Sequence, residues 1–238
     1  DKKHEDFIKP MLKVKNEIIR YNEERKIIRS TAKYAPAGQS TQMIIGATGE
    51  SDKDIMYSAT HFYKNYNMKR VYYSGYVPIS TDSRLPSLGS EVPMLRENRL
   101  YQTDWLLRFY GFSVNEILDA DNPNLEMDID PKLMWALRNL NYFPIDINKA
   151  DSRMLARIPG IGMGSVHKII NSRKYRNLSW DHLKKMGVAL NRAKYFIICN
   201  SNEWERRDLD AAKIKGMILQ SQNGKFKNNY INQLSLFN

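Results

Sequence analysis

The residues with the clearest chemical potential form a glycine-rich turn between two short segments of helical periodicity. The turn is Pro159-Gly160-Ile161-Gly162, with Gly164 two residues further on. Glycine tolerates positive φ and lets the backbone approach a ligand closely. A turn that opens a helix also presents unpaired amides and the positive end of the helix dipole, which favour a phosphate. The sequence therefore predicts a phosphate-binding backbone at residues 159–164, with Ile161 inserted into the core.

Basic side chains gather around this turn. Between Arg153 and Lys194 the chain carries ten Lys or Arg residues and a single acid, Asp181. The whole chain has 37 Lys and Arg against 26 Asp and Glu, a net charge of +11, which favours nucleic acid first and anionic membrane second. A scattered excess would indicate only a solvated surface, whereas clustering favours a binding site. We expect four cations to contact phosphates: Arg157, Lys168, Arg173 and Lys174.

The extended string around the turn closely resembles the helix-hairpin-helix motif. The resemblance includes Asp146-Ile147-Asn148-Lys149-Ala150, Leu155 and Ile169, and it implies backbone binding of duplex DNA without sequence readout. A weaker second copy runs from Trp180 to Ile197 and has one glycine, Gly187, where the first has two. The pair is similar to the tandem arrangement of this class, with a mainly structural second hairpin. An ordinary helical hairpin is the alternative. We expect an all-α tandem helix-hairpin-helix domain at residues 131–200.

The first half of the chain alternates helical and strand patterns. Apolar spacing predicts helices at 5–28, 52–66 and 94–110 and strands at 42–47, which reads as buried, and 70–77. Helix, strand, helix, strand is the pattern of a parallel α/β sheet. The five acids between Asp119 and Asp130 predict a surface linker at 119–130, because the spacing of a calcium loop is missing.

Two long strings, residues 35–47 and 93–112, are similar to the C-terminal part of the radical SAM proteins of DNA modification or repair. With the module above, the resemblance covers about residues 34–199. It implies that residues 1–118 are an α/β remnant, the last strands and helices of a partial (β/α) barrel. It also implies that the complete parent protein uses S-adenosylmethionine and a four-iron four-sulfur cluster held by a CxxxCxxC triplet. An imperfect G-x-I-x-G-x-x-E stretch, which in radical SAM barrels lies near the adenine, implies contacts with S-adenosylmethionine at Gln42, Ile44, Gly46 and Glu50. A buried strand that ends in a glycine turn explains these residues equally well.

Cys199 is the only cysteine of the chain. A single thiol cannot hold an iron–sulfur cluster or a zinc ribbon, so we expect no cofactor in this chain and no radical chemistry from it alone. Its apolar run, residues 195–199, predicts a buried thiol, and the lack of disulfides favours a cytoplasmic setting. No run of 18 apolar residues exists, so we expect no membrane partner. Because the chain starts at Asp1, we expect it to be a fragment.

The last residues resemble the pentapeptide by which bacterial DNA polymerases and repair proteins dock on the sliding clamp. Leu234, Leu236 and Phe237 offer apolar anchors for a groove, and Gln233 offers an orienting amide. We therefore expect residues 201–238 to be a basic tail that ends in a clamp-binding peptide. The alternative is an apolar end that packs back on its own domain.

Together these features predict the DNA-binding part of a radical SAM enzyme of DNA modification or repair, whose catalytic residues are unknown. A non-catalytic DNA-binding or scaffold protein recruited to the sliding clamp is the first alternative. A protein that binds structured RNA is the second, because backbone recognition alone separates DNA from RNA poorly.

Overall fold

The computed structural model describes residues 4–199 and 210–223. The described residues form two compact units, the first within Asp1–Asp104 and Leu118–Met127 and the second within Trp105–Ile117 and Asp128–Asn238. The division falls inside helix α3 (Met94–Phe109), which contributes residues to both. Within the described ranges, every helix is too short or too polar to cross a membrane.

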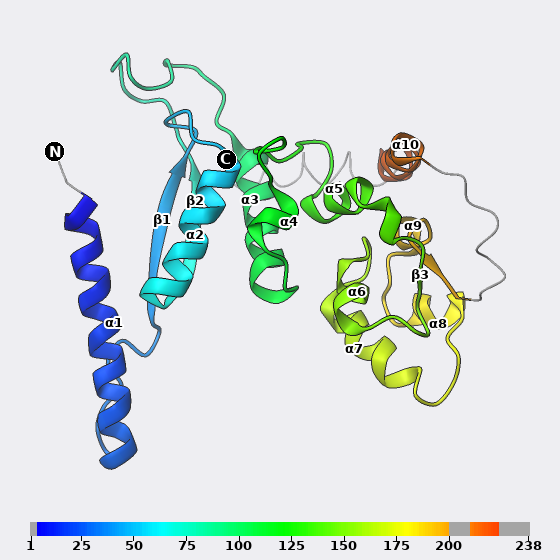
Figure 1. Cartoon of the computed structure of the whole chain (residues 1–238). Helices are drawn as coiled ribbons and strands as arrows, with labels where there is room; N and C mark the ends of the chain where they lie inside the picture. The colour runs from blue at the N-terminus through cyan, green and yellow to red at the C-terminus, as the bar shows by residue number, and fades with distance from the viewer. Residues whose placement is uncertain (1–3, 200–209, 224–238) are drawn as a thin grey trace, which may run out of the picture. The chain divides into compact units, whose positions relative to one another are not determined.

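The first unit contains one parallel pair of strands joined through a helix (Figure 1). Its elements before α3 are α1 (His4–Ile27), β1 (Gln39–Ile45), α2 (Asp52–Tyr66) and β2 (Met68–Gly75). Strands β1 and β2 pair in parallel. Ser51 is the N-cap of α2: its hydroxyl accepts from the Asp54 amide, and the Asp54 carboxylate accepts from the Ser51 amide. The elements lie within a few residues of their predicted positions.

Strand β1 is less buried than its apolar composition predicts. Its side chains alternate between more and less exposed positions, and only Ile45, at its end, is buried. Ile44 is 51% exposed. The prediction of a buried strand is therefore wrong, because one face of this two-stranded sheet has no covering layer in the described part of the unit.

Residues 119–130 differ from the surface linker that their acidity predicts. Leu125 and Ile129 are buried, and the Leu125 amide donates to Asp52 Oδ2 at 2.8 Å. Asn124 Oδ1 accepts from the Asp52 amide at 3.1 Å. One division between the two units, Met127/Asp128, lies inside this predicted linker, but residues 105–117 also belong to the second unit and residues 118–127 to the first. The acidity of this segment predicted exposure, but the buried side chains of Leu125 and Ile129 decide where the segment packs.

The second unit is built from short helices around one apolar core. Its elements are α4 (Val114–Ile117), α5 (Pro131–Arg138), η1 (Leu140–Tyr142), β3 (Ile145–Asp146), α6 (Ser152–Arg157), α7 (Met163–Ser172), α8 (Trp180–Lys185), α9 (Leu190–Ala193), β4 (Ile197–Ile198) and α10 (Ala211–Asn223). The region expected to be all-α thus also contains a two-residue parallel pair, β3 with β4. Buried Leu155, Ile158, Val166, Leu183 and Phe196 contribute to the core. Cys199 is buried, as predicted.

Candidate nucleic-acid interface

Helices α6 and α7 and the turn between them, residues 152–172, form the first hairpin (Figure 1). Asp151 caps α6 by accepting from the Met154 amide at 2.7 Å. Gly160 has a φ of +89°, a region that side chains with a Cβ rarely adopt. A Cβ at Gly160 would also lie 2.6 Å from the carbonyl oxygen of Ala189. Both conformation and packing therefore require glycine at this position.

The N-terminus of α7 follows this turn and lacks a side-chain cap. Its N-cap is Gly162, and its first turn contains no acidic residue. The first amides of a helix have no partner inside the helix. Within the described ranges, the Gly162 amide also has no hydrogen-bond acceptor. Gly164 is exposed, and a Cβ there would meet nothing within 4 Å. These free amides and the helix dipole form an arrangement that suits an anion.

Helices α8 and α9 and the turn between them, residues 180–193, form the second hairpin. Its glycine, Gly187, has a φ of +85°. The turns of the two hairpins contact each other, since the Ala189 amide donates to Gly160 O at 2.9 Å. Ser165 Oγ and Lys168 Nζ donate to Met186 O at 3.2 and 3.4 Å. Cations on either hairpin therefore lie around the same pair of turns.

Arg157 does not lie where the sequence predicts. Its side chain is 3% exposed, and its Nη2 lies 2.5 Å from Glu116 Oε1. The guanidinium also lies over the rings of Phe112 and Trp135, with its Cζ at 4.5 and 5.7 Å from their centroids. Burial raises the pKa of the Glu116 carboxyl, but hydrogen bonds from Arg157 and Ser113 outweigh it and leave the pKa below its usual value. This position does not support the predicted phosphate contact of Arg157, because Glu116 and the rings of Phe112 and Trp135 already surround its guanidinium.

The other predicted cations divide into structural and accessible ones. Arg173 is half-buried, and its Nη1 donates to the carbonyls of Ile147 and Ala150 at 3.1 and 2.5 Å, so it holds the backbone before α6. Lys168 and Lys174 are exposed. Two further cations that the prediction missed, Lys184 and Lys185, are exposed in the last turn of α8, directly before the second turn. The signal was present in the sequence as a basic pair beside a glycine.

Asn148, in the extended string before the turn, acts as a tie between segments. Its Nδ2 donates to the carbonyls of Leu178 and Cys199 at 3.2 and 3.1 Å. Its Oδ1 accepts from the Leu178 amide at 2.8 Å. The side chain therefore joins the strand entering the first hairpin to the segment between the hairpins, a structural role.

Lys132 is a residue of this region that sequence reasoning missed entirely. It is buried, and its Nζ donates to the carbonyl of Ile161, inside the first turn, at 2.6 Å. Ile161 is itself buried, as predicted. A lysine in the first turn of a helix ordinarily faces solvent, so composition and periodicity held no signal for this contact.

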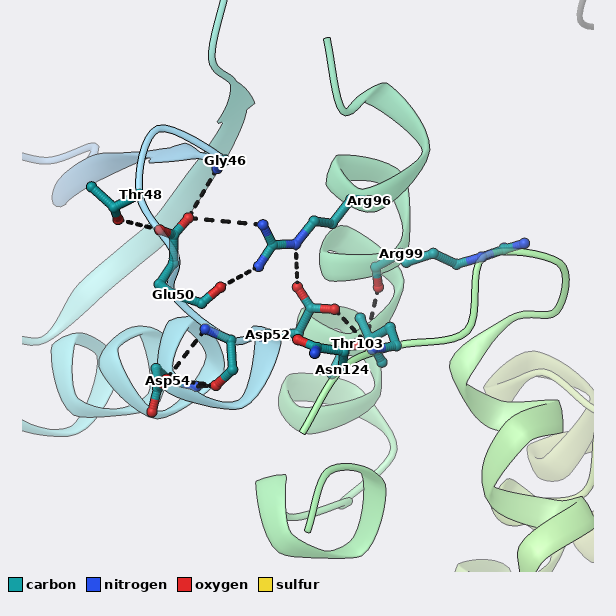
Figure 2. A network of polar contacts seen from close by, with 11 residues as sticks. Gly46, Thr48, Glu50, Asp52, Asp54, Arg96, Arg99, Thr103 and Asn124 are labelled. Atoms are coloured by element: carbon teal, nitrogen blue, oxygen red, sulfur yellow. Dashed lines mark hydrogen bonds and ion pairs between the residues drawn. The ribbon is translucent and has the colours of Figure 1, made fainter. Parts of the chain in front are cut away.

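The predicted cofactor contacts lie in the first unit, and Figure 2 shows the network around Glu50. Glu50 Oε1 accepts from the Gly46 amide at 2.9 Å and lies 3.9 Å from Arg96, and Glu50 Oε2 accepts from the Thr48 hydroxyl. Burial raises the pKa of Glu50, but these hydrogen bonds and Arg96 outweigh it and lower the pKa overall. The structure therefore brings Gly46 and Glu50 together in a network of internal bonds.

The remaining predicted cofactor residues lie apart from that network. Gln42 and Ile44 are exposed on β1. In the described part of the chain, no three His, Cys, Asp or Glu side chains are grouped so that they could hold a metal ion. With one cysteine, which is buried, the residues of this chain do not fit a four-iron cluster.

The predicted clamp-binding residues, Gln233, Leu234, Leu236 and Phe237, lie outside the described residues.

No family model, no curated protein and no solved structure matches this chain.

Proposed function

We propose that the second unit binds duplex DNA by its phosphate backbone, without reading the base sequence, as a tandem helix-hairpin-helix domain. The observation that carries this proposal is the uncapped N-terminus of α7. There the Gly162 amide has no acceptor in the described chain, and Gly160 holds the preceding turn in a conformation that residues with a Cβ rarely adopt. Such a helix end suits a phosphate, and the surrounding cations favour a polyanion that carries many phosphates.

The charges around the two turns support a polyanionic ligand. Lys168 lies against the second turn, and Lys184 and Lys185 directly precede it. The only acid between Arg153 and Lys194 is Asp181. Backbone amides and lysines contact phosphates rather than base edges, so they position a duplex without specifying its sequence. The proposed binding is therefore strong at low salt and indifferent to sequence.

The wider proposal concerns the parent protein. The strings at 35–47 and 93–112, and the parallel β1–α2–β2 crossover, support a partial-barrel remnant of a radical SAM enzyme that the second unit delivers to DNA. Since the cluster does not fit this chain, its cysteines would have to come from elsewhere in such a parent. A non-catalytic DNA-binding or scaffold protein is the alternative; an upstream coding region with a CxxxCxxC triplet separates the two.

A single charge placed at the α7 N-cap tests the DNA proposal. In Gly162→Asp, φ remains ordinary (−88°), and a Cβ would meet only the Tyr110 hydroxyl at 3.6 Å. Aspartate is a favoured N-cap, so the variant should fold at least as stably as the parent. Its carboxylate would occupy the free amides and repel phosphate. We expect binding to a fluorescent duplex to weaken about 10- to 100-fold, because one charge-assisted hydrogen bond contributes about 1.5–3 kcal/mol.

The matched control is Ala189→Asp, which adds the same charge at the equivalent N-cap of the second hairpin. We expect it to weaken binding only about threefold, through the general field. If Gly162→Asp bound the duplex with the affinity of the parent, or if both variants lost the same affinity, the first hairpin would not be the phosphate site. A duplex RNA of the same length, bound equally well, would favour the RNA alternative.

A further inference from the structure

Lys132 is a buried lysine that the proposed DNA contact does not use directly. It is the second residue of α5, after the N-cap Asp130, and its side chain is 8% exposed. Its Nζ donates to Ile161 O at 2.6 Å and lies 4.7 Å from the centroid of the Tyr110 ring. A lysine is seldom buried without a specific role for its charge.

The contact with Ile161 determines the orientation of one peptide group. In a trans peptide, the carbonyl of one residue and the amide of the next point in opposite directions. Cis bonds in the described chain are limited to Phe143–Pro144, so the Ile161–Gly162 peptide is trans. With the Ile161 carbonyl bonded to Lys132, the Gly162 amide must point away from Lys132. Among the described residues, no acceptor bonds that amide at the start of α7.

The charges that face Lys132 come from three elements. Asp130, before α5, stabilises the ammonium, but it is itself bonded to Arg192 of α9 and to the Leu133 amide. Arg192 and Arg157 of α6 disfavour the ammonium. Burial, the largest cause, lowers the pKa of Lys132 to about 7. The side chain therefore changes its charge in a range where most lysines do not.

We propose that Lys132 is a positioning residue whose protonated form holds the Gly162 amide outward, so that binding a DNA phosphate there is coupled to uptake of a proton. This inference rests on the proposed DNA binding by the first hairpin. A DNA phosphate bound to the Gly162 amide lies on the opposite side of the Ile161–Gly162 peptide from Lys132. Its negative charge favours the protonated, charged form of the lysine. The complex therefore binds more protons than its free partners, and affinity falls as pH rises.

The test is duplex affinity against pH at constant ionic strength. The background carries His167→Gln and His182→Gln, so that the imidazoles of the two hairpins cannot contribute to the pH dependence. We expect the affinity for duplex to fall about three- to tenfold between pH 6 and pH 8.5. This is below the limit for the uptake of one full proton, which is tenfold in affinity per pH unit. Lys132→Met, similar in volume, should bind weakly at all pH values with a flat profile. Lys149→Met, an exposed lysine paired with Asp146, should keep the parental profile.

A second measurement separates failure of this inference from failure of the DNA proposal. Without DNA, the carbonyl carbon of Ile161 and the amide nitrogen of Gly162 should titrate together near pH 7 by NMR, and not in Lys132→Met. Unfolding free energy should rise with pH between about 7 and 10, because there the unfolded chain holds the proton that the folded chain has lost. Absence of DNA binding with these titrations intact overturns only the DNA proposal. A normal lysine titration near pH 10, or pH-dependent binding that persists in Lys132→Met, overturns the role of Lys132.

Discussion

The two hairpins have the same plan but differ in what their turns leave free. Both contain a glycine with positive φ, Gly160 at +89° and Gly187 at +85°. The N-cap residue of each second helix is equivalent, Gly162 for α7 and Ala189 for α9. The Ala189 amide is bonded to Gly160 O, whereas in the described chain the Gly162 amide has no acceptor. The second hairpin thus uses its N-cap amide to hold the first, whereas the corresponding amide of the first hairpin has no partner among the described residues.

The two hairpins also differ in the length of their second helix and in the contacts that hold them in place. Helix α7 has ten residues and α9 has four, so only α7 has an extended dipole behind its N-terminus. The first turn also receives the Lys132 contact at Ile161, and α6 is anchored by the Arg157–Glu116 pair. Similar local sequences therefore give one proposed binding element and one supporting element, because their surroundings differ.

The largest effect on stability should come from replacing the turn glycine of each hairpin, Gly160 or Gly187, with alanine. In Gly160→Ala, the left-handed conformation costs about 1–2 kcal/mol, and the contact at 2.6 Å with Ala189 O adds about 1–3 kcal/mol. In Gly187→Ala, only the conformational cost applies, because the nearest atom to a Cβ is Ser165 Oγ at 4.0 Å. Urea denaturation measures the free energy of unfolding of each variant. Equal losses of this free energy in the two variants would show that the turns are not packed differently.

The next effect concerns the arginines that anchor each hairpin. Arg157→Met leaves Glu116 without its buried partner and should destabilise the unit by about 2–3 kcal/mol, whereas the more exposed Arg192–Asp130 pair should contribute about 1 kcal/mol. Thermal melts of Arg157→Met and Arg192→Met compare the two. Below the melting range, the DNA affinity of Arg157→Met should equal that of the parent; a clear loss there would restore Arg157 as a phosphate contact.

A smaller effect should follow from single surface lysines. If three to five phosphates are neutralised, the log–log salt dependence of duplex binding should have a slope of about −3 to −5. Lys168→Ala, beside both turns, should reduce the magnitude of that slope by about one. Lys149→Ala, 79% exposed and paired with Asp146 at 3.6 Å, should leave it unchanged. Equal changes would indicate a diffuse field rather than a site at the two turns.

The smallest effect on DNA binding, none at all, should come from the tail. We propose that Gln233-Leu234-Ser235-Leu236-Phe237 docks on the bacterial sliding clamp independently of either hairpin. Leu236→Ala with Phe237→Ala removes two apolar anchors, about 2–4 kcal/mol by area. Clamp binding measured by calorimetry should disappear while duplex affinity stays constant. If the tail instead packs on its own domain, the parent binds no clamp and the double variant melts at a lower temperature.

Local sequence determined the positions of the turns and of most helices. A glycine at Gly160, the capping pair Ser51 and Asp54, and the alternation of apolar patterns act over a few residues, so their effects are visible without the fold. The burial of Cys199 followed in the same way from its apolar run. These features depend on backbone conformation and short-range hydrogen bonds, which neighbouring residues decide.

Only the tertiary structure decided which cations are available to a ligand. Arg157, predicted at the surface, is covered by Glu116 and two aromatic rings, and Lys132, which the sequence did not single out, lies beneath the first turn. The exposed face of β1 and the packing of Leu125 against Asp52 were decided in the same way. The charge of a side chain is a property of its residue type, but its solvation and its partner depend on segments tens of residues away in the chain.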